Sequence, residues 1–295
     1  MRSLTSWMKQ ARSLIAPSQP ECLFCGRRGR PSPEWPGICV HCQSGIPWIR
    51  VPRCQICGRH VGCPDCSRSH GPLPIRCNRS AVAYTSDMRE ILGQYKYRGN
   101  ERLAPLLGLM LDRAYELLQQ EQSNQQLNGA QQGVFFNKPF PVFQSKLRVR
   151  VGSNLWQADL LVPVPVSAVR LSERGFNQAE RLADVVSLRR GVPQLPLLVR
   201  THHTAKQSFK SRSERLADMK YAFAGNTDSA VLQSLNEHLH SRASHQLEQR
   251  PLRIIIVDDI YTTGSTIRAC AGALQQLCRS LDCTAEIYSL TWARS

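Results

Sequence analysis

One stretch of the chain decides its fold: Ile254-Ile255-Ile256-Val257-Asp258-Asp259-Ile260-Tyr261-Thr262-Thr263-Gly264-Ser265-Thr266. The four β-branched residues at its start predict a fully buried strand, and two adjacent carboxylates stand where that strand should end. A hydroxyl-rich loop follows, and residues 267–271 are typical of the first turns of a helix. In an α/β sheet the ligand crevice lies at the carboxyl ends of the strands. The stretch therefore predicts an α/β fold that brings two acids and a loop to one place.

The chemistry of this stretch suits a sugar 5-phosphate. Backbone N–H groups from Thr263 to Thr266 can point at a phosphate, and a helix dipole favours the anion. The two carboxylates suit the hydroxyls of a ribose or a hydrated Mg²⁺, because both require oxygen acceptors. An ordinary strand followed by a helix capped by Asp259 or Thr263 would explain only one acid and one hydroxyl.

All 13 residues resemble the phosphoribosyl-pyrophosphate (PRPP) signature of type I phosphoribosyltransferases. That signature consists of an apolar strand, two acids, a variable pair, Thr-Gly and a small hydroxyl residue. The resemblance implies PRPP binding with Mg²⁺, and we assign any catalytic role to Asp258 and Asp259. The residues expected to contact PRPP in this stretch are Asp258, Asp259, Thr262, Thr263, Gly264, Ser265 and Thr266. A Walker A loop is excluded because it ends in Gly-Lys-Ser/Thr.

The charge of the chain points to an anionic partner. The chain has 295 residues, which is enough for one large domain or two modest ones, and its net charge is +16. The first hundred residues hold 15 Lys/Arg and 5 Asp/Glu, so +10 of the total lies there. This asymmetry favours nucleic acid or a phosphorylated ligand, with a solvated basic face as the alternative.

The N-terminal residues do not form a secretion signal. Residues 1–20 lack the apolar core of a signal peptide. Along the whole chain, charged residues interrupt each apolar run before it reaches transmembrane length, so we expect a cytoplasmic protein. The apolar residues of the segment 1–20 recur at helical spacing, which predicts an amphipathic helix. This helix is expected to pack on the chain's own domain, and peripheral contact with a membrane or a partner is the alternative.

Four Cys-x-x-Cys pairs follow, and they predict a metal-binding head at residues 21–78. Eight of the twelve cysteines form these pairs: Cys22/Cys25, Cys39/Cys42, Cys54/Cys57 and Cys63/Cys66. Two such pairs complete a tetrahedral Cys₄ zinc site, so the head can hold one or two structural Zn²⁺. Sequential pairing gives two zinc ribbons and interleaved pairing gives a cross-brace, and both remain open. Disulfides are disfavoured because no signal directs the chain to an oxidising compartment.

The predicted head is rich in arginine. Trp35 and Trp48 lie among its arginines, which are Arg27, Arg28, Arg30, Arg50, Arg53, Arg59 and Arg68. Arginines with aromatic residues suit single-stranded nucleic acid, through phosphate contacts and base stacking. A structural knob that presents a protein-binding surface is an equal alternative.

Hydrophobic periodicity predicts alternating strands and helices in the rest of the chain. The expected strands are 81–84 and 158–165, the second running into a proline-stiffened loop, and the expected helices are 88–97, 102–118 and about 179–189. Polar, Gln- and Asn-rich segments predict surface insertions near 120–155 and 225–250, the second with a short helix around 230–240. Residues 79–295 are therefore expected to form one domain.

A basic segment can supply cations for a pyrophosphate. Residues 170–220 contain eleven Lys/Arg and five Asp/Glu. Arg170 and Arg174 are four residues apart and can share one face of a helix toward a pyrophosphate. Residues 200–223 fit a mobile loop that closes over a bound diphosphate, or a nucleic-acid contact.

Taken in order, these segments resemble the ComF family, which includes ComFC and GntX-like proteins. The resemblance rests on the cysteine pairs, the PRPP loop, and the residues Lys96, Pro163-Val164-Pro165, Arg170, Arg174-Gly175-Phe176-Asn177-Gln178, Thr204, Gln207, Arg215 and Ala222-Phe223. It implies a doubly wound, mainly parallel sheet of the type I phosphoribosyltransferase kind after a small zinc-ribbon domain, with Lys96 at the PRPP site. It also implies a part in DNA uptake during natural competence and in DNA utilisation, with single-stranded DNA and DNA-processing proteins as partners.

Three functions remain open. The chain is an active phosphoribosyltransferase or PRPP-dependent factor in DNA uptake, a non-catalytic DNA-processing adaptor whose PRPP site senses nucleotide state, or a nucleotide-salvage transferase. The zinc head argues against salvage, because base salvage needs no such module.

Overall fold

The computed structural model describes residues 21–63, 66, 73–97, 99–130, 155–201, 222–244 and 250–295. The chain divides into two compact units, residues 1–46 and 47–295. The predicted amphipathic helix at 1–20 lies outside the described residues, and so do residues 202–221 of the predicted closing loop. No helix in the described ranges is long and apolar enough to cross a membrane.

The described part of the first unit is built mainly from turns. Its short helix α2 (Val40–Ser44) begins after Cys39, and isolated bridges pair Glu21 with Arg28 and Pro31 with Cys39. Trp35 and Ile38 are buried. A segment with so few core residues would gain stability from a metal bound to its cysteines.

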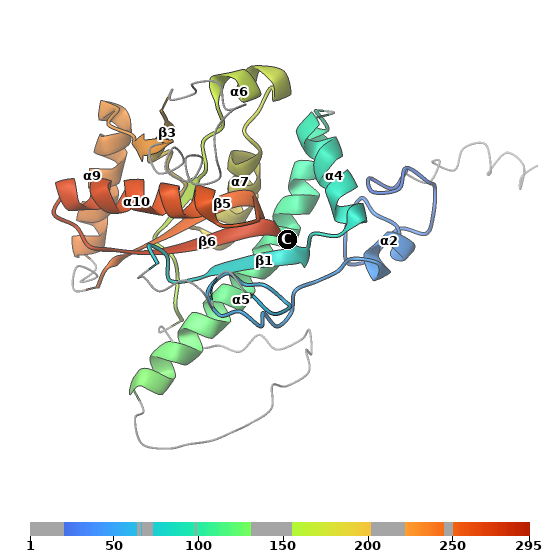
Figure 1. The fold of residues 1–295 in the computed structure, drawn as a ribbon, viewed down its shortest axis with the longest axis horizontal. Coiled ribbons are helices and arrows are strands. Elements are labelled where there is room, and N and C mark those ends of the chain that lie inside the picture. Colours follow the sequence, from blue (N-terminus) through green and yellow to red (C-terminus); the bar gives the residue numbers. More distant parts are fainter. Residues whose placement is uncertain are drawn as a thin grey trace, which may run out of the picture. The chain divides into compact units, whose positions relative to one another are not determined.

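The second unit contains a four-stranded parallel sheet in the order β1-β6-β5-β2 (Figure 1). The strands are β1 (Asn78–Ala83), β2 (Leu160–Pro163), β5 (Leu252–Tyr261) and β6 (Ala285–Arg294). The predicted strand at 254–257 is therefore the buried centre of β5, which pairs with a parallel neighbour on each side. A parallel sheet with both faces covered needs continuous apolar strands, which is why β5 lacks a polar face before Asp258. The predicted α/β fold is confirmed.

Helices cover the two faces of this sheet (Figure 1). Ile254 and Ile256 pack in one core cluster with residues of α10 (Ser265–Ser280). The alternate residues of β5 point to the opposite face, where α5 (Ala104–Ala130) contacts β1 and β6, and α7 (Gln178–Arg190) contacts β2 and β5. The other described elements are η1 (Glu101–Leu103), α4 (Ser86–Tyr97), α6 (Ala168–Arg174), α9 (Ser229–Ser244) and the antiparallel pair β3 (Leu198–Arg200) and β4 (Phe223–Gly225).

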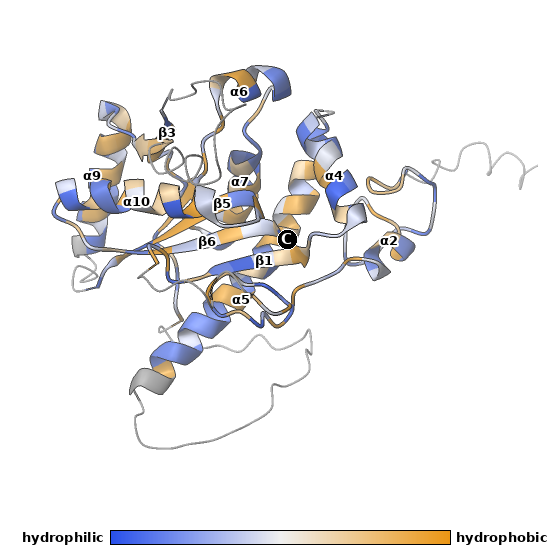
Figure 2. Ribbon diagram, viewed as in Figure 1, coloured by the Kyte–Doolittle hydropathy of each residue, from blue (hydrophilic) through white to orange (hydrophobic). Residues whose placement is uncertain are grey.

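Two polar segments are more helical than the sequence predicts. α5 continues to Ala130, although a loop was expected from residue 120, and α9 is longer than the short helix expected at 230–240. Gln and Glu are good helix formers despite their polarity, and Figure 2 shows the far part of α5 as largely hydrophilic. Tertiary contacts also hold the extension of α5, because the Ser123 hydroxyl accepts a hydrogen bond from the Trp156 N–H at 3.0 Å.

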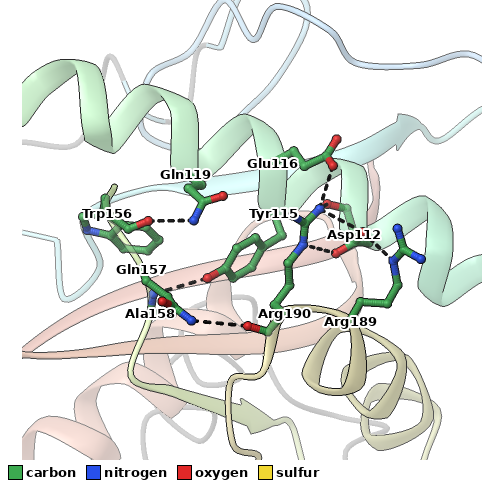
Figure 3. A network of polar contacts seen from close by, with 9 residues as sticks. All are labelled: Asp112, Tyr115, Glu116, Gln119, Trp156, Gln157, Ala158, Arg189 and Arg190. Atoms are coloured by element: carbon green, nitrogen blue, oxygen red, sulfur yellow. Dashed lines mark hydrogen bonds and ion pairs between the residues drawn. The ribbon is translucent and has the colours of Figure 1, made fainter. Parts of the chain in front are cut away.

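A polar network joins α5 to α7 (Figure 3). The Asp112 carboxylate of α5 is 3% exposed and forms ion pairs with Arg189 and Arg190 of α7. Arg190 Nη2 also reaches the Glu116 carboxylate at 2.8 Å. On the next turn of α5, the Tyr115 hydroxyl accepts a hydrogen bond from the Ala158 N–H at 3.4 Å, just before β2. The network therefore fixes the helices behind the sheet and has a structural role.

Candidate functional site

The two acids lie at the carboxyl end of β5, one of the two central strands of the parallel sheet. Asp258 pairs in register with Thr291 of β6, and β5 ends three residues later at Tyr261. The chain turns over residues 262–264 and enters α10 at Ser265. The strand, the acids, the loop and the helix N-terminus thus follow one another without interruption. We call residues 262–266 the phosphate loop, after the ligand that the sequence predicts for it.

Gly264 gives the phosphate loop its shape. It caps α10 with a left-handed backbone, φ +76°, and a Cβ at this position would lie 2.1 Å from the Tyr261 hydroxyl oxygen. Only glycine tolerates both conditions. The Arg268 N–H donates to the Gly264 carbonyl at 2.9 Å, so the N–H groups before it have no partner within the helix, and the Ser265 N–H makes a long contact of 3.5 Å with the Thr263 hydroxyl. Thr262 and Thr263 are exposed beside them.

A lysine from another element completes the acidic end of β5. Lys96 Nζ, on the last turn of α4, lies 2.7 Å from the Asp259 carboxylate. The Asp258 carboxyl accepts a hydrogen bond from the Asp259 N–H at 2.9 Å. Burial of the Asp258 carboxyl and the neighbouring Asp259 charge raise its pKa to about 7, although that hydrogen bond and Lys96 oppose the rise. The site therefore holds one carboxyl that changes charge near neutral pH.

The turn between α6 and α7 contacts α4 and orients it; its sequence is Arg174-Gly175-Phe176-Asn177-Gln178. Gly175 ends α6 with a left-handed backbone, and the Asn177 side chain caps α7 by accepting from the Ala179 N–H. Tyr95 of α4 is fully buried; its hydroxyl donates to the Gln178 carbonyl at 3.0 Å, and its ring lies 5.3 Å from that of Phe176. These contacts hold α4, and with it the neighbouring Lys96, in place.

The two arginines of this region differ in environment. The Arg174 guanidinium lies over the Tyr97 ring at 5.1 Å, and its Nη1 donates to the Gln178 side chain at 2.6 Å. Its buried Nε has no hydrogen-bond partner among the described residues. Arg170, one turn earlier on α6, is exposed. α4 and α6 are in contact, so both arginines belong to the same region as Lys96.

The eight paired cysteines gather into two clusters, and they do so in sequential order. The first cluster is Cys22, Cys25, Cys39 and Cys42, and the second cluster is Cys54, Cys57, Cys63 and Cys66. Within each cluster the four sulfur atoms lie within 4.8 Å of one another, which suits a tetrahedral Zn²⁺. The interleaved alternative is therefore wrong. Two sites fit a structural metal.

The two clusters share one local design. In the first, the Gly26 N–H bonds to the Cys22 carbonyl at 2.8 Å; in the second, the Gly58 N–H bonds to the Cys54 carbonyl at 3.0 Å. Both glycines have positive φ, which lets the chain turn tightly around the metal position. In the first cluster, burial opposes ionisation of Cys22, but backbone N–H groups of its neighbours lower its pKa to about 7. A thiolate is the form that binds metal.

Sequence reasoning missed one residue of the second unit and misread one residue of the first. Arg294 is buried at the end of β6 and donates hydrogen bonds to the carbonyls of Tyr261 and Thr262, at the start of the phosphate loop. A single arginine in the otherwise uncharged run from Tyr288 to Arg294 was the available signal. Trp35, expected near the arginines as a base-stacking residue, is only 5% exposed and belongs to the core of its unit.

Comparison with known proteins gives relatives over most of the chain. No protein-family model matches. The chain is 27% identical to competence protein ComFC of Bacillus subtilis over 291 residues, which cover 93% of this chain and 95% of that protein. It is 23% identical to DNA utilization protein YhgH of Salmonella typhi, covering 86% and 96% of the two chains. It is also 24% identical to competence protein ComFC of Streptococcus pneumoniae, covering 81% of each. The resemblance to these proteins is thereby confirmed.

Proposed function

We propose that this chain, a homologue of the ComFC and YhgH proteins over most of its length, binds PRPP at the carboxyl end of β5 and acts in DNA uptake or utilisation. One observation carries the proposal: Asp258 and Asp259 are followed directly by a glycine-shaped loop and the N-terminus of a long helix. A sugar 5-phosphate needs acceptors for its hydroxyls and N–H donors for its phosphate, and this arrangement offers both.

The residues divide the work by charge. Asp258 and Asp259 accept hydrogen bonds from the ribose hydroxyls, and Thr262 to Thr266 hold the 5-phosphate. Lys96, beside Asp259, supplies a cation, and Arg170 and Arg174 on α6 supply two more for the pyrophosphate. Mg²⁺ bound with PRPP would neutralise pyrophosphate charge. The buried Arg174 Nε has no hydrogen-bond partner among the described residues, so Arg174 keeps an unused donor.

Catalysis would follow from the same charges. When pyrophosphate leaves C1 of the ribose, negative charge grows on the leaving group and positive charge on the sugar. Cations fixed at the pyrophosphate lower that barrier, and the carboxylates face the developing positive charge. The acceptor is open, so PRPP binding without turnover, as in a nucleotide-sensing adaptor, is the alternative.

The part in DNA handling rests on the relatives' names and on charge. Relatives named for competence and for DNA utilisation align along most of the chain. Three arginines that follow the half-buried Phe24 in the sequence of the first unit are exposed: Arg27, Arg28 and Arg30. We propose that single-stranded DNA contacts such basic surface through its phosphates, which makes binding salt-dependent.

Calorimetric titration of PRPP with Mg²⁺ into the zinc-loaded protein tests the proposal. We expect binding by the wild type and none by the Asp258→Asn/Asp259→Asn variant. Asp282→Asn is the matched control, because this exposed residue has a positive φ that asparagine tolerates and lies in the turn after α10. Equal binding by all three proteins, or none by the wild type, would refute the proposed site.

Single-stranded DNA is measured separately by fluorescence anisotropy at several salt concentrations. DNA binding that survives Asp258→Asn/Asp259→Asn would mean that DNA and PRPP use different surfaces. Pyrophosphate release from PRPP, with DNA or nucleobases offered as acceptors, then distinguishes a transferase from an adaptor.

A further inference from the structure

Arg294 reaches two parts of the second unit with one guanidinium. On one side its Nη1 donates to the carbonyl oxygens of Tyr261, at 3.1 Å, and Thr262, at 2.9 Å. On the other side its Nε donates to the Cys57 carbonyl at 3.1 Å and its Nη2 to the Cys57 Sγ at 3.2 Å. The side chain is 2% exposed, so these protein groups largely replace water around it. The phosphate loop and the second cluster are thus joined by a single residue.

The cluster side of this connection is held firmly against the sheet. The Asn78 side chain, at the start of β1, donates to the same Cys57 carbonyl at 3.2 Å, and the Asn78 N–H bonds to the Ile56 carbonyl at 2.7 Å. A Cβ on Gly58 would lie 2.5 Å from the Asn78 carbonyl oxygen, so the turn packs directly on the strand. A change in the position of Cys57 would therefore alter its hydrogen bonds with Arg294.

The loop side is packed just as closely. The guanidinium lies 4.8 Å from the centre of the Tyr261 ring, and the Tyr261 hydroxyl fills the space beneath Gly264. Tyr261 is 4% exposed. Arg294 therefore fixes both the backbone at the entrance to the phosphate loop and the ring that supports its glycine.

Charge makes the connection sensitive to metal. Among the described residues, no aspartate or glutamate forms an ion pair with Arg294, whose Nη1 also donates to the Ser295 backbone oxygen. Four thiolates around Zn²⁺ have a net charge of −2, so a loaded second cluster would place a counter-charge beside this buried cation. A metal-bound sulfur is also a better hydrogen-bond acceptor than a neutral thiol, because it is ionised. Metal binding at the second cluster would thus strengthen the hydrogen bond between the Arg294 guanidinium and the Cys57 sulfur.

We propose that Arg294 is a positioning residue through which metal binding at the second cluster shapes the phosphate loop. Zinc at this cluster and PRPP at the loop then raise each other's affinity, because coupling between two sites is reciprocal. This linkage rests on the proposed PRPP binding, whereas the effect of the metal on the loop does not. The first cluster, in the other compact unit, is the internal control.

Hydrogen exchange tests the effect on the loop without any ligand. Residues 261–271 are compared in the wild type, in Arg294→Gln, in Cys54→Ser/Cys66→Ser and in the control Cys22→Ser/Cys25→Ser. We expect exchange in this segment at least about fivefold faster in the first two variants than in the wild type, and unchanged in the control. Combining the second-cluster change with Arg294→Gln should add no further increase, because both remove the same connection.

Exchange in α5 serves as the measure of global folding. If Arg294→Gln loses protection there as well, Arg294→Lys replaces it, because lysine keeps the charge but not the planar fork that donates to five acceptors. Unchanged exchange at 261–271 in a folded Arg294 variant would overturn the proposal. So would an equal response to changes in either cluster.

Zinc release tests the linkage to PRPP. A thiol-reactive mercurial displaces zinc, and a metallochromic dye records the two releases with and without Mg²⁺ and PRPP. We expect PRPP to slow one release at least about fivefold in the wild type and not in Arg294→Gln. If PRPP binds but neither release slows, the linkage is refuted and the proposed function stands. If PRPP does not bind, the proposed function fails, and the exchange experiment still decides the role of Arg294.

Discussion

Replacing Asp258 with asparagine should stabilise the free protein while removing its PRPP binding. In the folded protein the pKa of Asp258 is raised from 3.8 to about 7 by burial and by Asp259. The folded carboxyl thus keeps its proton up to about pH 7, whereas the unfolded one loses it near pH 3.8. Because the folded state binds more protons in this interval, stability falls as the pH rises through it.

The size of the effect follows from that difference in pKa. For Asp258 the cost to folding is about 2 kcal/mol at pH 5.5 and about 4 kcal/mol at pH 8. Asparagine carries no charge, and its carbonyl oxygen can still accept the hydrogen bond from the Asp259 N–H. Asp258→Asn should therefore gain stability over the wild type, and the gain should grow by about 1 to 2 kcal/mol between pH 5.5 and pH 8, allowing for solvent near the carboxyl.

Urea unfolding at the two pH values measures this change, in buffer without phosphate or Mg²⁺. Asp282→Asn is measured in parallel, because it subtracts any effect of pH on the zinc clusters and on overall charge. A gain that is the same at both pH values, or an Asp258→Asn variant less stable than the wild type at pH 8, would refute the reasoning. The expected combination of higher stability and lost binding is the mark of a residue kept for function.

Three further predictions concern the residues around this acid. Gly264→Ala should weaken PRPP binding by more than about tenfold and lower the temperature of unfolding, because the new Cβ clashes with the Tyr261 hydroxyl and the backbone is left-handed. Calorimetric titration measures the affinity and thermal unfolding measures the stability. Lys96→Met removes the partner of Asp259, so PRPP affinity at pH 7 should fall about tenfold. The pH at which PRPP binding is half-maximal should also move upward, because the lysine favours the ionised carboxylate. Calorimetric titration from pH 6 to 9 measures this midpoint, and an unshifted midpoint would contradict the prediction. Asp112→Asn removes the carboxylate that Arg189 and Arg190 share, although Arg190 keeps Glu116. It should cost about 3 kcal/mol in urea unfolding and leave PRPP affinity unchanged; a large loss of affinity would give the network a role at the site.

The sequence was most informative where one local pattern carries both structure and chemistry. The run from Ile254 to Thr266 predicts strand, acids, loop and helix because a buried parallel strand must be apolar throughout and a phosphate loop needs glycine. The Cys-x-x-Cys spacing predicts metal sites for the same reason, since two residues between thiols are what one tetrahedral ion requires. Neither prediction depends on distant parts of the chain.

Contacts between distant segments could not be predicted in this way. The pairing order of the cysteines depends on how the chain folds back, and spacing alone allowed two answers. The extension of α5 beyond residue 120 is held by a hydrogen bond from the Trp156 N–H to Ser123, and Trp156 lies far along the sequence. Arg294 joins Cys57 to Thr262 across the whole second unit, and only a fold places these three residues together.

A crystal structure of the protein with Mg²⁺ and PRPP would test the central claim most directly. We predict that the 5-phosphate lies on the N–H groups at the start of α10, with the ribose hydroxyls within hydrogen-bonding distance of Asp258 and Asp259. The pyrophosphate should extend toward Lys96 and Arg174. PRPP bound elsewhere, or the carboxyl end of β5 empty at ligand concentrations well above those of the cell, would contradict the account.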